Sequence, residues 1–268
     1  MRKMVAASII FAAGYGSRMV GFSGNKTLLP LRPGSIPFEG EYPIILEVIR
    51  NLPQGPKALV IHHRKEEVIA LTRNLGVSYY DQPVLNGTGG ALIAAEGFLV
   101  CTDQEHVIIT MGDIPFVRQI TYHHLISQLK DQDLVVLGFK PMDRAQYGIL
   151  EIEDGKVRRI TEWRYWKEYP LERQAHFEAC NSGIYGARRS TLLTYLKKLR
   201  QRSHEVVKER RGQMVHVEEY FITDLVELIN NDGLTVGFVV VDEEKEVMGI
   251  DTYEDLVLAQ DMFAQRDR

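Results

Sequence analysis

The 268-residue sequence is poor in cysteine and has no long apolar run, and each absence excludes a class of protein. Its two cysteines, Cys101 and Cys180, lie far apart and in no metal-binding spacing, which predicts free thiols in a reducing compartment. No apolar run is long enough to span a bilayer. The apolar run at residues 5–13 is too short for a signal peptide and leads directly into glycines. We therefore expect a cytoplasmic protein.

Positive charge is not in excess either. The chain has 32 Lys and Arg against 36 Asp and Glu, a formal net charge of −4, which argues against a general nucleic-acid-binding protein. An anionic ligand would therefore be held by local positive charge. The sequence contains no internal repeat, and in particular none of the hexapeptide repeats of a left-handed β-helix. We expect no nucleic-acid or membrane partner.

What the chain does contain is an alternation of short apolar runs and helical patterns over its first half. This alternation predicts a parallel sheet with helices on both faces. The predicted strands lie at residues 5–13, 57–61, 77–80, 106–111 and 134–139, and the predicted helices at 44–51, 66–75, 88–100 and 119–130. Residues 33–43, rich in Pro and Gly, predict a loop. The fold class that we predict is α/β, with a doubly wound, mostly parallel sheet.

From residue 147 onward the pattern changes to that of a smaller, β-rich part. Residues 149–152 and 156–162 predict a hairpin that turns at Asp154 and Gly155. The basic stretch at residues 197–211 is interrupted by two glutamates, which is typical of a solvated helix. The remaining predicted elements are strands at 179–187 and 234–241 and helices at 191–198, 222–230 and 253–263.

A strand followed by a glycine-rich bend is the most informative stretch. The apolar run at residues 5–13 ends at Gly14 and Gly16, whose missing side chains let backbone N–H groups approach a bulky anion. Arg18 and Lys26 add cationic donors. The simplest interpretation is a triphosphate site at the end of a parallel strand. An ordinary strand-to-loop turn with scattered charges is the alternative.

Two familiar phosphate-binding motifs fit this stretch badly. A dinucleotide fingerprint requires a third small residue where this chain has Met19. A P-loop requires Gly followed directly by Lys, whereas Asn25 separates Gly24 from Lys26. Neither motif accounts for the bend.

The stretch instead resembles the signature of the sugar-1-phosphate nucleotidyltransferases: Ala-Ala-Gly-x-Gly-x-Arg-Met at residues 12–19, then Asn25-Lys26. The chain is most similar to the uridyltransferase (pyrophosphorylase) domain of the bacterial N-acetylglucosamine-1-phosphate uridyltransferases, and the resemblance covers nearly its whole length. It implies transfer from an NTP to a sugar-1-phosphate, with Arg18 and Lys26 offsetting triphosphate charge. The residues that it implies for nucleotide binding are Ala12, Ala13, Gly14, Gly16, Ser17, Gln82, Gly87 and Thr88.

A second glycine-rich stretch contains Gln82 and residues 87–91. A glutamine amide suits the imide edge of uracil or thymine, and the glycines let backbone approach the base and ribose. Thr88 would cap the following helix. Taken alone, the stretch is equally a glycine-rich loop with a helix cap. The resemblance makes it the base-binding segment and points to a pyrimidine nucleotide.

Two aspartates are the candidate ligands of a divalent cofactor, Mg²⁺. Asp113 follows a buried strand and a glycine, where its carboxylate is a natural hard oxygen ligand for Mg²⁺, although a structural Asp in a turn is the alternative. The resemblance implies Asp251 as the second metal ligand, at a position where the bacterial uridyltransferases carry Asn. Asp251 could instead cap the last helix.

For the sugar-phosphate acceptor, the resemblance implies Gly148, Glu162 and Asn181. It ends with Glu-Tyr-Phe-Ile-Thr-Asp at residues 219–224, which opens a helix. The aromatic segment at residues 163–179 is longer than in the uridyltransferases. Its aromatic side chains could stack on a sugar or pack as part of a β-ribbon.

The resemblance divides one continuous catalytic domain into a nucleotide-binding part, residues 1–146, and a sugar-phosphate-binding part with the closing helix, residues 147–268. UTP is the favoured nucleotide. Two alternatives are open: a transferase that uses CTP or dTTP with another phosphorylated sugar or alcohol, and a non-catalytic nucleotide-sugar sensor. Gln82 disfavours CTP, because cytosine presents a donor where uracil presents an acceptor.

Overall fold

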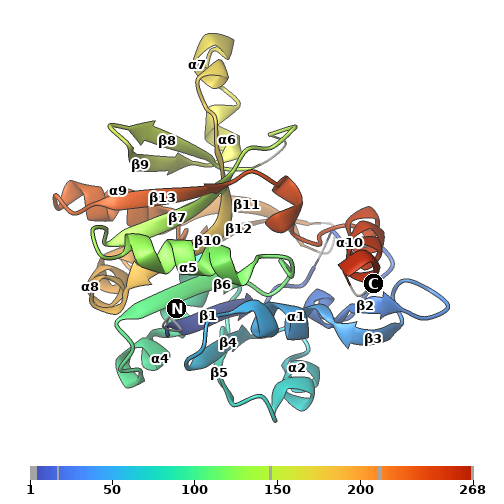
Figure 1. Cartoon of the computed structure of the whole chain (residues 1–268). Helices are drawn as coiled ribbons and strands as arrows, with labels where there is room; N and C mark the ends of the chain where they lie inside the picture. Colours follow the sequence, from blue (N-terminus) through green and yellow to red (C-terminus); the bar gives the residue numbers. More distant parts are fainter. Residues whose placement is uncertain (1–4, 17, 145–146, 211–212, 267–268) are drawn as a thin grey trace.

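The computed structural model describes residues 5–16, 18–144, 147–210 and 213–266 of the chain. Its centre is one nine-stranded sheet (Figure 1). The strands of this sheet are β1 (Ala7–Ala12), β4 (Lys57–Ile61), β5 (Val77–Asp81), β6 (His106–Met111), β7 (Leu134–Phe139), β8 (Ile149–Glu153), β9 (Lys156–Thr161), β10 (Cys180–Arg188) and β13 (Val236–Val241). The main path runs β13-β7-β10-β6-β1-β4-β5, and the β8–β9 hairpin joins it through β10.

The main path of this sheet is mostly parallel. β1 pairs in parallel with β4 and β6, β4 with β5, and β13 with β7. β10 runs antiparallel between β6 and β7. Because β10 and β13 come from the second half of the chain, both halves contribute to the same sheet. The predicted mostly parallel sheet is confirmed.

Helices cover both faces of the sheet, as predicted. The helices are α1 (Ile44–Asn51), α2 (Lys65–Thr72), α3 (Gly87–Ala94), α4 (Glu96–Cys101), α5 (Gln119–Gln128), α6 (Trp163–Trp166), α7 (Leu171–Ala175), α8 (Arg189–Leu199), α9 (Asp224–Asn231) and α10 (Tyr253–Arg266), with short 3-10 turns η1 (Lys26–Leu28) and η2 (Glu244–Glu246). Among the described residues, no helix is long and apolar enough to cross a membrane.

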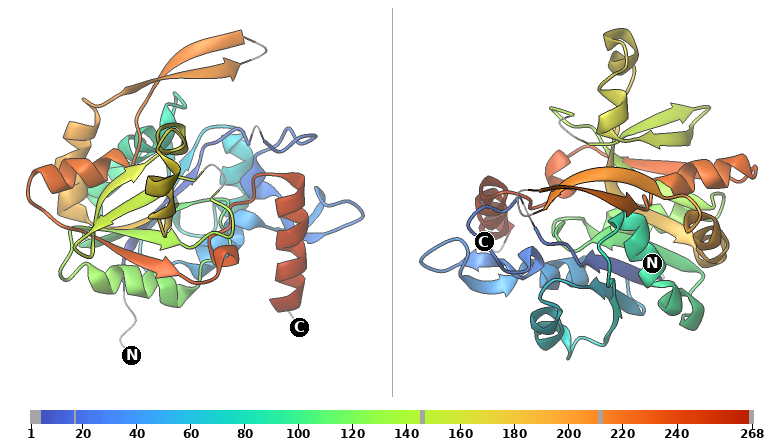
Figure 2. Two further views of the ribbon diagram at one scale, coloured as in Figure 1. Left: turned by 90° about the horizontal axis from the view of Figure 1, so that it is seen from above. Right: turned by 180° about the vertical axis from the view of Figure 1, so that it is seen from behind.

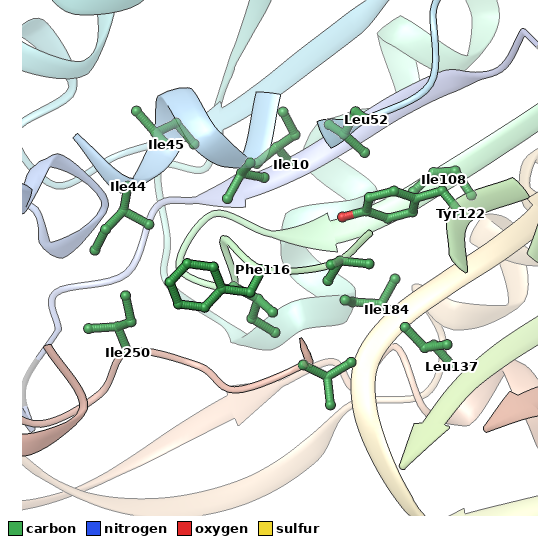
Figure 3. Close-up of a cluster of buried hydrophobic side chains, with 14 of the residues drawn as sticks. Ile10, Ile44, Ile45, Leu52, Ile108, Phe116, Tyr122, Leu137, Ile184 and Ile250 are labelled. Atoms are coloured by element: carbon green, nitrogen blue, oxygen red, sulfur yellow. The ribbon is translucent and has the colours of Figure 1, made fainter. Parts of the chain in front are cut away.

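The core has one layer on each face, because successive residues of a strand point to opposite faces. Ile10 of β1 packs with α1, α2, α5 and α10 in one cluster, and Ile9 packs with α3, α4, α8 and α9 in the other. Figure 3 shows part of the first cluster, in which Phe116 and Tyr122 lie near Ile10 and Ile108. A strand buried on both faces is apolar at most or all of its positions, which explains why β6, polar only at His106 and Thr110, and β7 match their predictions.

Two predicted segments need correction. The helix expected at residues 88–100 is two helices, α3 and α4, which meet at Ala95. The loop expected at residues 33–43 is bounded by two strands, β2 (Pro30–Pro33) and β3 (Gly40–Pro43), which form a small antiparallel hairpin. The sequence did not predict these two strands because they contain prolines, and proline is tolerated in strands only at edges and ends.

A larger error concerns the basic stretch at residues 197–211. Only its first residues belong to α8; from His204 the chain forms β11 (His204–Arg210), which pairs with β12 (Gln213–Glu219) in a separate two-stranded ribbon. In the view from above, this ribbon projects from the body of the molecule (Figure 2). Val215, His216 and Val217 of β12 alternate between apolar and polar side chains, whereas the two valines of β11, Val206 and Val207, are adjacent, so only β12 has part of the period of two that is typical of a strand.

The aromatic segment that follows β9 also differs from expectation. It forms the short helices α6 and α7, which project at the top of Figure 1, and it contains no β-ribbon in the described residues. Trp166 is buried and donates its indole N–H to the carbonyl of Tyr147 at 2.8 Å. Arg173 stacks over the Tyr169 ring, with its guanidinium carbon 3.7 Å from the ring centre. These aromatic residues pack the segment onto the protein.

Candidate functional site

The ends of four strands, β1, β4, β5 and β6, lie at one edge of the sheet. The backbone N–H of Gly112, just after β6, donates to the Phe11 carbonyl of β1 at 2.8 Å, and that of Gln82, just after β5, donates to the Ile61 carbonyl of β4 at 3.0 Å. Ligands of open α/β sheets bind at the carboxyl ends of the strands. The chain has a pocket of about 440 Å³ at this edge.

Most of the sequence-predicted residues line this pocket. They are Ala12, Ala13, Gly14, Gly16, Arg18, Lys26, Gln82, Gly87, Thr88, Asp113 and Asp251. Ser17 lies outside the residues that the structure describes. The volume is within the range of small-molecule sites. The sequence therefore located one contiguous site from segments more than 200 residues apart.

Asn25, to which the sequence analysis assigned no role of its own, holds the glycine bend in place. Its buried side-chain amide donates to the carbonyls of Ala12 at 3.1 Å and His63 at 2.9 Å, and its oxygen accepts from the backbone N–H of Thr27 at 3.0 Å. Asn25 thus ties the end of β1 to the start of η1, whose first residue is Lys26. Asparagine before a short helical turn is the signal that could have identified it.

The two glycines of the bend serve different needs. Gly16 has a φ of +63°, and a Cβ on it would lie 3.3 Å from the Cβ of Lys26, so it gives room to the lysine stem. Gly14 has no neighbouring atom within 4 Å of its Cβ position. The protein itself therefore has room for a side chain at Gly14, and that open space belongs to the pocket.

Lys26 joins the two aspartates. Its Nζ lies 2.5 Å from Asp113 Oδ2 and also donates to Asp251 Oδ1. The side chains are 13% exposed for Lys26, 19% for Asp113 and 27% for Asp251, so this cluster is shielded but open to the pocket. The predicted convergence of residues 113 and 251 beside the glycine bend is confirmed.

A second cation completes the cluster. Arg18, 71% exposed, lies with its guanidinium 2.9 Å from Asp251 Oδ2. Burial lowers the pKa of Lys26, but the charges of Asp113 and Asp251 outweigh that effect and the pKa is raised above its usual value. The negative charges of Asp113 and Asp251 are therefore compensated by the positive charges of Lys26 and Arg18 in the pocket.

The carboxylates of Asp113 and Asp251 have the chemistry of a Mg²⁺ site. Within the described residues no group of three or more His, Cys, Asp or Glu side chains is arranged to hold a metal ion. Mg²⁺ in phosphoryl-transfer sites typically takes one or two carboxylates and completes its coordination with waters and substrate phosphates. Both carboxylates contact one cationic group, the Lys26 ammonium, so they lie close enough together to contact a single cation. This arrangement fits such a site.

The alternative role of Asp251, as the cap of the last helix, is wrong. Thr252 is the residue that caps α10: its hydroxyl accepts from the N–H of Asp255 at 3.2 Å, and Asp255 Oδ2 accepts from the N–H of Thr252 at 2.8 Å. This reciprocal pair is a capping box. It leaves the Asp251 carboxylate free to face Lys26 and Arg18.

Gln82 is buried with its amide orientation set by its neighbours. The side-chain NH₂ donates to the Gly87 carbonyl at 3.1 Å and to Asn86 Oδ1 at 3.1 Å. A backbone carbonyl can only accept, so the nitrogen of the amide must face Gly87. Both amide hydrogens are thus directed to the protein, and the oxygen is the atom that Gln82 can offer to a ligand.

Gly87 and Gly89 are required by the close approach of the Tyr220 backbone. Gly89 donates its N–H to the Tyr220 carbonyl at 2.8 Å, and Tyr220 donates to the Asn86 carbonyl at 2.8 Å. A Cβ on Gly87 would lie 2.5 Å from the Tyr220 oxygen, and one on Gly89 would lie 2.8 Å from it. Gly87 also lines the pocket, so the expectation that backbone at this segment approaches a base stays a prediction. Thr88 does not cap α3; its hydroxyl accepts from the Ile222 N–H at 3.3 Å.

The three predicted acceptor residues lie together, and none of them is among the described residues that line the pocket. Asn181 donates its backbone N–H to the Gly148 carbonyl at 2.8 Å, and Glu162 Oε2 lies 3.6 Å from the Cβ position of Gly148. Glu162 accepts a hydrogen bond from the Thr223 hydroxyl at 3.1 Å. Burial raises the pKa of Glu162, more than this hydrogen bond lowers it.

Glu219 is a pocket residue to which the sequence analysis assigned no role. It is the last residue of β12, is 4% exposed, and lines the pocket beside Gly87 and Thr88. Its place in the Glu-Tyr-Phe-Ile-Thr-Asp motif was the available signal. That signal could not place the carboxylate, because the neighbouring pocket residues lie about 130 positions earlier in the chain.

Comparison with known proteins agrees with this geometry. Residues 8–160 match the model of the MobA-like NTP transferase domain. The chain is 30% identical over 274 residues to the bifunctional protein GlmU of Ruegeria pomeroyi, a match that covers 99% of the chain and 54% of that relative. The chain thus spans about half the length of the curated relatives that it matches.

Solved structures share the fold. One is the uridine diphosphate N-acetylglucosamine pyrophosphorylase of Trypanosoma brucei, with a TM-score of 0.72 and 14% identity over 96% of this chain and 65% of that one. Another is a CMP:2-keto-3-deoxy-manno-octonic acid synthetase in complex with CTP, with a TM-score of 0.63 and 16% identity over 97% of this chain and 99% of that one. At these identities the likeness is one of fold.

Proposed function

This chain belongs to the MobA-like NTP transferase family, and from that membership we propose that it joins UTP to a sugar-1-phosphate, releasing pyrophosphate and forming a UDP-sugar. N-acetylglucosamine-1-phosphate and glucose-1-phosphate are the acceptors of choice. The observation that carries the proposal is the cluster of Lys26, Asp113 and Asp251 beside the open Gly14, at the carboxyl ends of β1 and β6.

The proposed chemistry is an in-line attack of the acceptor phosphate on the α-phosphorus of UTP. The acceptor phosphate is already ionised near neutral pH, so the protein needs no general base, and its work is alignment and charge neutralisation. The backbone around Gly14 would bind the phosphate oxygens that leave as pyrophosphate. Lys26 and Arg18 would exchange part of their contact with the aspartates for contact with the triphosphate. Asp113 and Asp251 would hold Mg²⁺, which when bound neutralises phosphate charge.

The nucleotide preference rests on Gln82. With its NH₂ directed to Gly87 and Asn86, the Gln82 oxygen is an acceptor that matches the N3–H donor of uracil or thymine. Cytosine has an acceptor at N3, and two acceptors facing one another are unfavourable. This supports UTP or dTTP over CTP.

The acceptor site would be the group of Gly148, Glu162 and Asn181. One Glu162 oxygen accepts from Thr223 and the other is available to a sugar hydroxyl or amide. Asn181 donates from its amide to the Tyr185 hydroxyl at 2.8 Å and accepts from the Gly183 N–H at 3.0 Å. Its remaining amide hydrogen is therefore the group that it can offer to the sugar.

A pyrophosphate-release screen tests the proposal directly. The full chain with Mg²⁺ would be assayed with each of UTP, dTTP, CTP and ATP against a panel of sugar-1-phosphates and phospho-alcohols. Release with UTP and a sugar-1-phosphate, absent in Asp113→Ala, is the expected result. Release only with CTP and a phospho-alcohol would replace the proposed substrates. Tight binding of a UDP-sugar without any release would instead identify a sensor.

A further inference from the structure

Three aromatic side chains from separate parts of the chain contact one another, and the proposed reaction does not use them. Phe22 lies in the loop between the glycine bend and η1, Phe38 lies between β2 and β3, and Tyr253 is the first residue of α10. The Phe22 and Phe38 rings are stacked with centres 5.5 Å apart, and the Tyr253 ring meets Phe38 edge-on at 5.6 Å. This aromatic cluster joins the loop to the β2–β3 hairpin and to the last helix.

The loop that contains Phe22 carries both cations of the site. Arg18 lies four residues before Phe22, and Lys26 lies four residues after it. Within this loop Val20 is 83% exposed, whereas the Phe22 side chain packs against the first core cluster. The ring also lies against the loop itself, because a Cβ on Gly24 would be 2.4 Å from Phe22 Cζ. The placement of the loop on the protein therefore depends in part on this ring.

The other end of the aromatic cluster is fixed close to Asp251. The helix α10 begins two positions after Asp251, and Figure 1 shows the β2–β3 hairpin beside this helix. Gln260 of α10 binds the hairpin, because its amide donates to the carbonyls of Pro30 at 2.9 Å and Pro37 at 2.8 Å. Phe38 directly follows Pro37. The ring of Phe38 is thus attached to the helix that follows Asp251.

The ion pair of Arg18 with Asp251 needs such a support. The guanidinium lies 2.9 Å from Asp251 Oδ2, but the Arg18 side chain is 71% exposed. An exposed ion pair contributes little, because water screens the charges and a long side chain loses rotamer freedom on pairing. The aromatic cluster links the chain segments on both sides of this pair. None of its three rings is among the described residues that line the pocket, so the cluster can affect a ligand only through the residues that it holds.

We propose that Phe22, Phe38 and Tyr253 are positioning residues, which together hold Arg18 where its guanidinium can bind the triphosphate. The inference rests on the proposed function, because that function assigns Arg18 to the triphosphate. An arginine that is held in place before the nucleotide arrives loses less conformational freedom on binding. The aromatic cluster thereby gives the hairpin and the last helix a part in nucleotide affinity.

Two variants of the full chain and one matched control test the inference. Phe38→Ala removes the middle ring and both of its contacts. Tyr253→Ala removes an end ring that is 43% exposed, and is the second variant in case Phe38→Ala does not fold. The control is Tyr42→Ala, because Tyr42 stacks on Phe263 at 5.1 Å and so joins the same hairpin to the far end of the same helix. Thermal melting would confirm that each variant is folded.

Hydrogen exchange reports the order of the loop without any ligand. The Phe22 N–H donates to the Met19 carbonyl at 3.3 Å, and its exchange can be followed at that position. We expect this amide to exchange roughly fivefold faster in Phe38→Ala, the effect of losing an aromatic pair, and to a smaller extent faster in Tyr253→Ala. The rate in Tyr42→Ala should be that of wild type. An unchanged rate in both test variants, or an equal increase in Tyr42→Ala, overturns the inference.

Titration calorimetry with UTP, in the absence of an acceptor, tests whether the aromatic cluster acts through Arg18. We expect Phe38→Ala to bind UTP roughly fivefold more weakly than wild type, and this loss to disappear when both chains also carry Arg18→Gln. A purely structural role would give a loss that adds to that of Arg18→Gln, which overturns the inference, as does undiminished UTP binding in Phe38→Ala. UTP binding to wild type without pyrophosphate release in the presence of acceptors would contradict the transferase proposal and leave this inference standing.

Discussion

Replacing Lys26 by methionine tests the centre of the site most directly. Methionine keeps an unbranched stem beside Gly16 but removes the ammonium that joins Asp113 and Asp251. The two carboxylates then face one another, and within the described part of the chain their remaining counter-charge is Arg18, which is mostly exposed. Both the stability of the chain and its activity depend on this ammonium.

The size of the stability effect follows from the exposure of the groups. Breaking a fully buried ion pair costs about 3–5 kcal/mol, whereas an exposed pair contributes about 0–1 kcal/mol. Lys26, Asp113 and Asp251 are 13%, 19% and 27% exposed, so we expect a loss between these limits, about 1–3 kcal/mol. For activity, the loss of one preorganised charge contact corresponds to a decrease in kcat of roughly 10²-fold or more.

Urea unfolding followed by circular dichroism measures the first quantity, and pyrophosphate release measures the second. The pKa of Lys26 is raised in the folded chain, so its contribution is complete below the ordinary value of 10.5 and is lost only as the pH rises through the folded pKa. The deficit of Lys26→Met should therefore be the same at pH 7 and pH 9.

Mg²⁺ provides an independent readout of the same site. Carboxylates that have lost their lysine are open to a divalent cation, so Mg²⁺ without nucleotide should raise the Tm of Lys26→Met more than that of wild type. Lys197→Met, at an exposed position of α8, is the matched control. Unchanged stability and unchanged turnover in Lys26→Met would refute the assignment of the glycine bend as a triphosphate site.

Three further substitutions test the other parts of the site. Asp113→Ala should abolish turnover while the circular dichroism spectrum stays native, and near-full activity in Mg²⁺ would remove Asp113 from the metal role. Gly14→Ala should change the free energy of unfolding by less than about 0.5 kcal/mol, because nothing lies within 4 Å of its Cβ position. The same change should weaken UTP binding roughly tenfold in calorimetry; undiminished binding would place the phosphates elsewhere. Glu162→Gln should raise the Tm at pH 7, because burial disfavours the ionised carboxylate, and should raise the acceptor KM. Since the pKa of Glu162 is raised, the stabilisation should disappear as the pH falls below that pKa, and a gain that is independent of pH would contradict the reasoning.

Local patterns in the sequence were sufficient to predict the strands whose burial is regular. β6 and β7 have the predicted bounds because both of their faces are covered, so that residues 107–109 of β6 are apolar and β7 contains no polar residue. The β8–β9 hairpin was predicted from Asp154 and Gly155, both of which have positive φ. The glycine bend and Asp113 were found in the same way, because each directly follows such a strand.

Tertiary structure decided the features that depend on distant neighbours. The β11–β12 ribbon has no continuous apolar run, so its strands could be recognised only from their pairing with each other. The reason for Gly87 and Gly89 is the backbone of Tyr220, which no local pattern around residue 87 contains. Glu219 and Asn25 could be assigned to the site only from the structure, because the residues beside them in the site come from other segments of the chain. The periodicity of apolar residues along a helix or strand indicates which of its faces is buried. It does not indicate which residues pack against that face, because these are set only when distant segments of the chain come together.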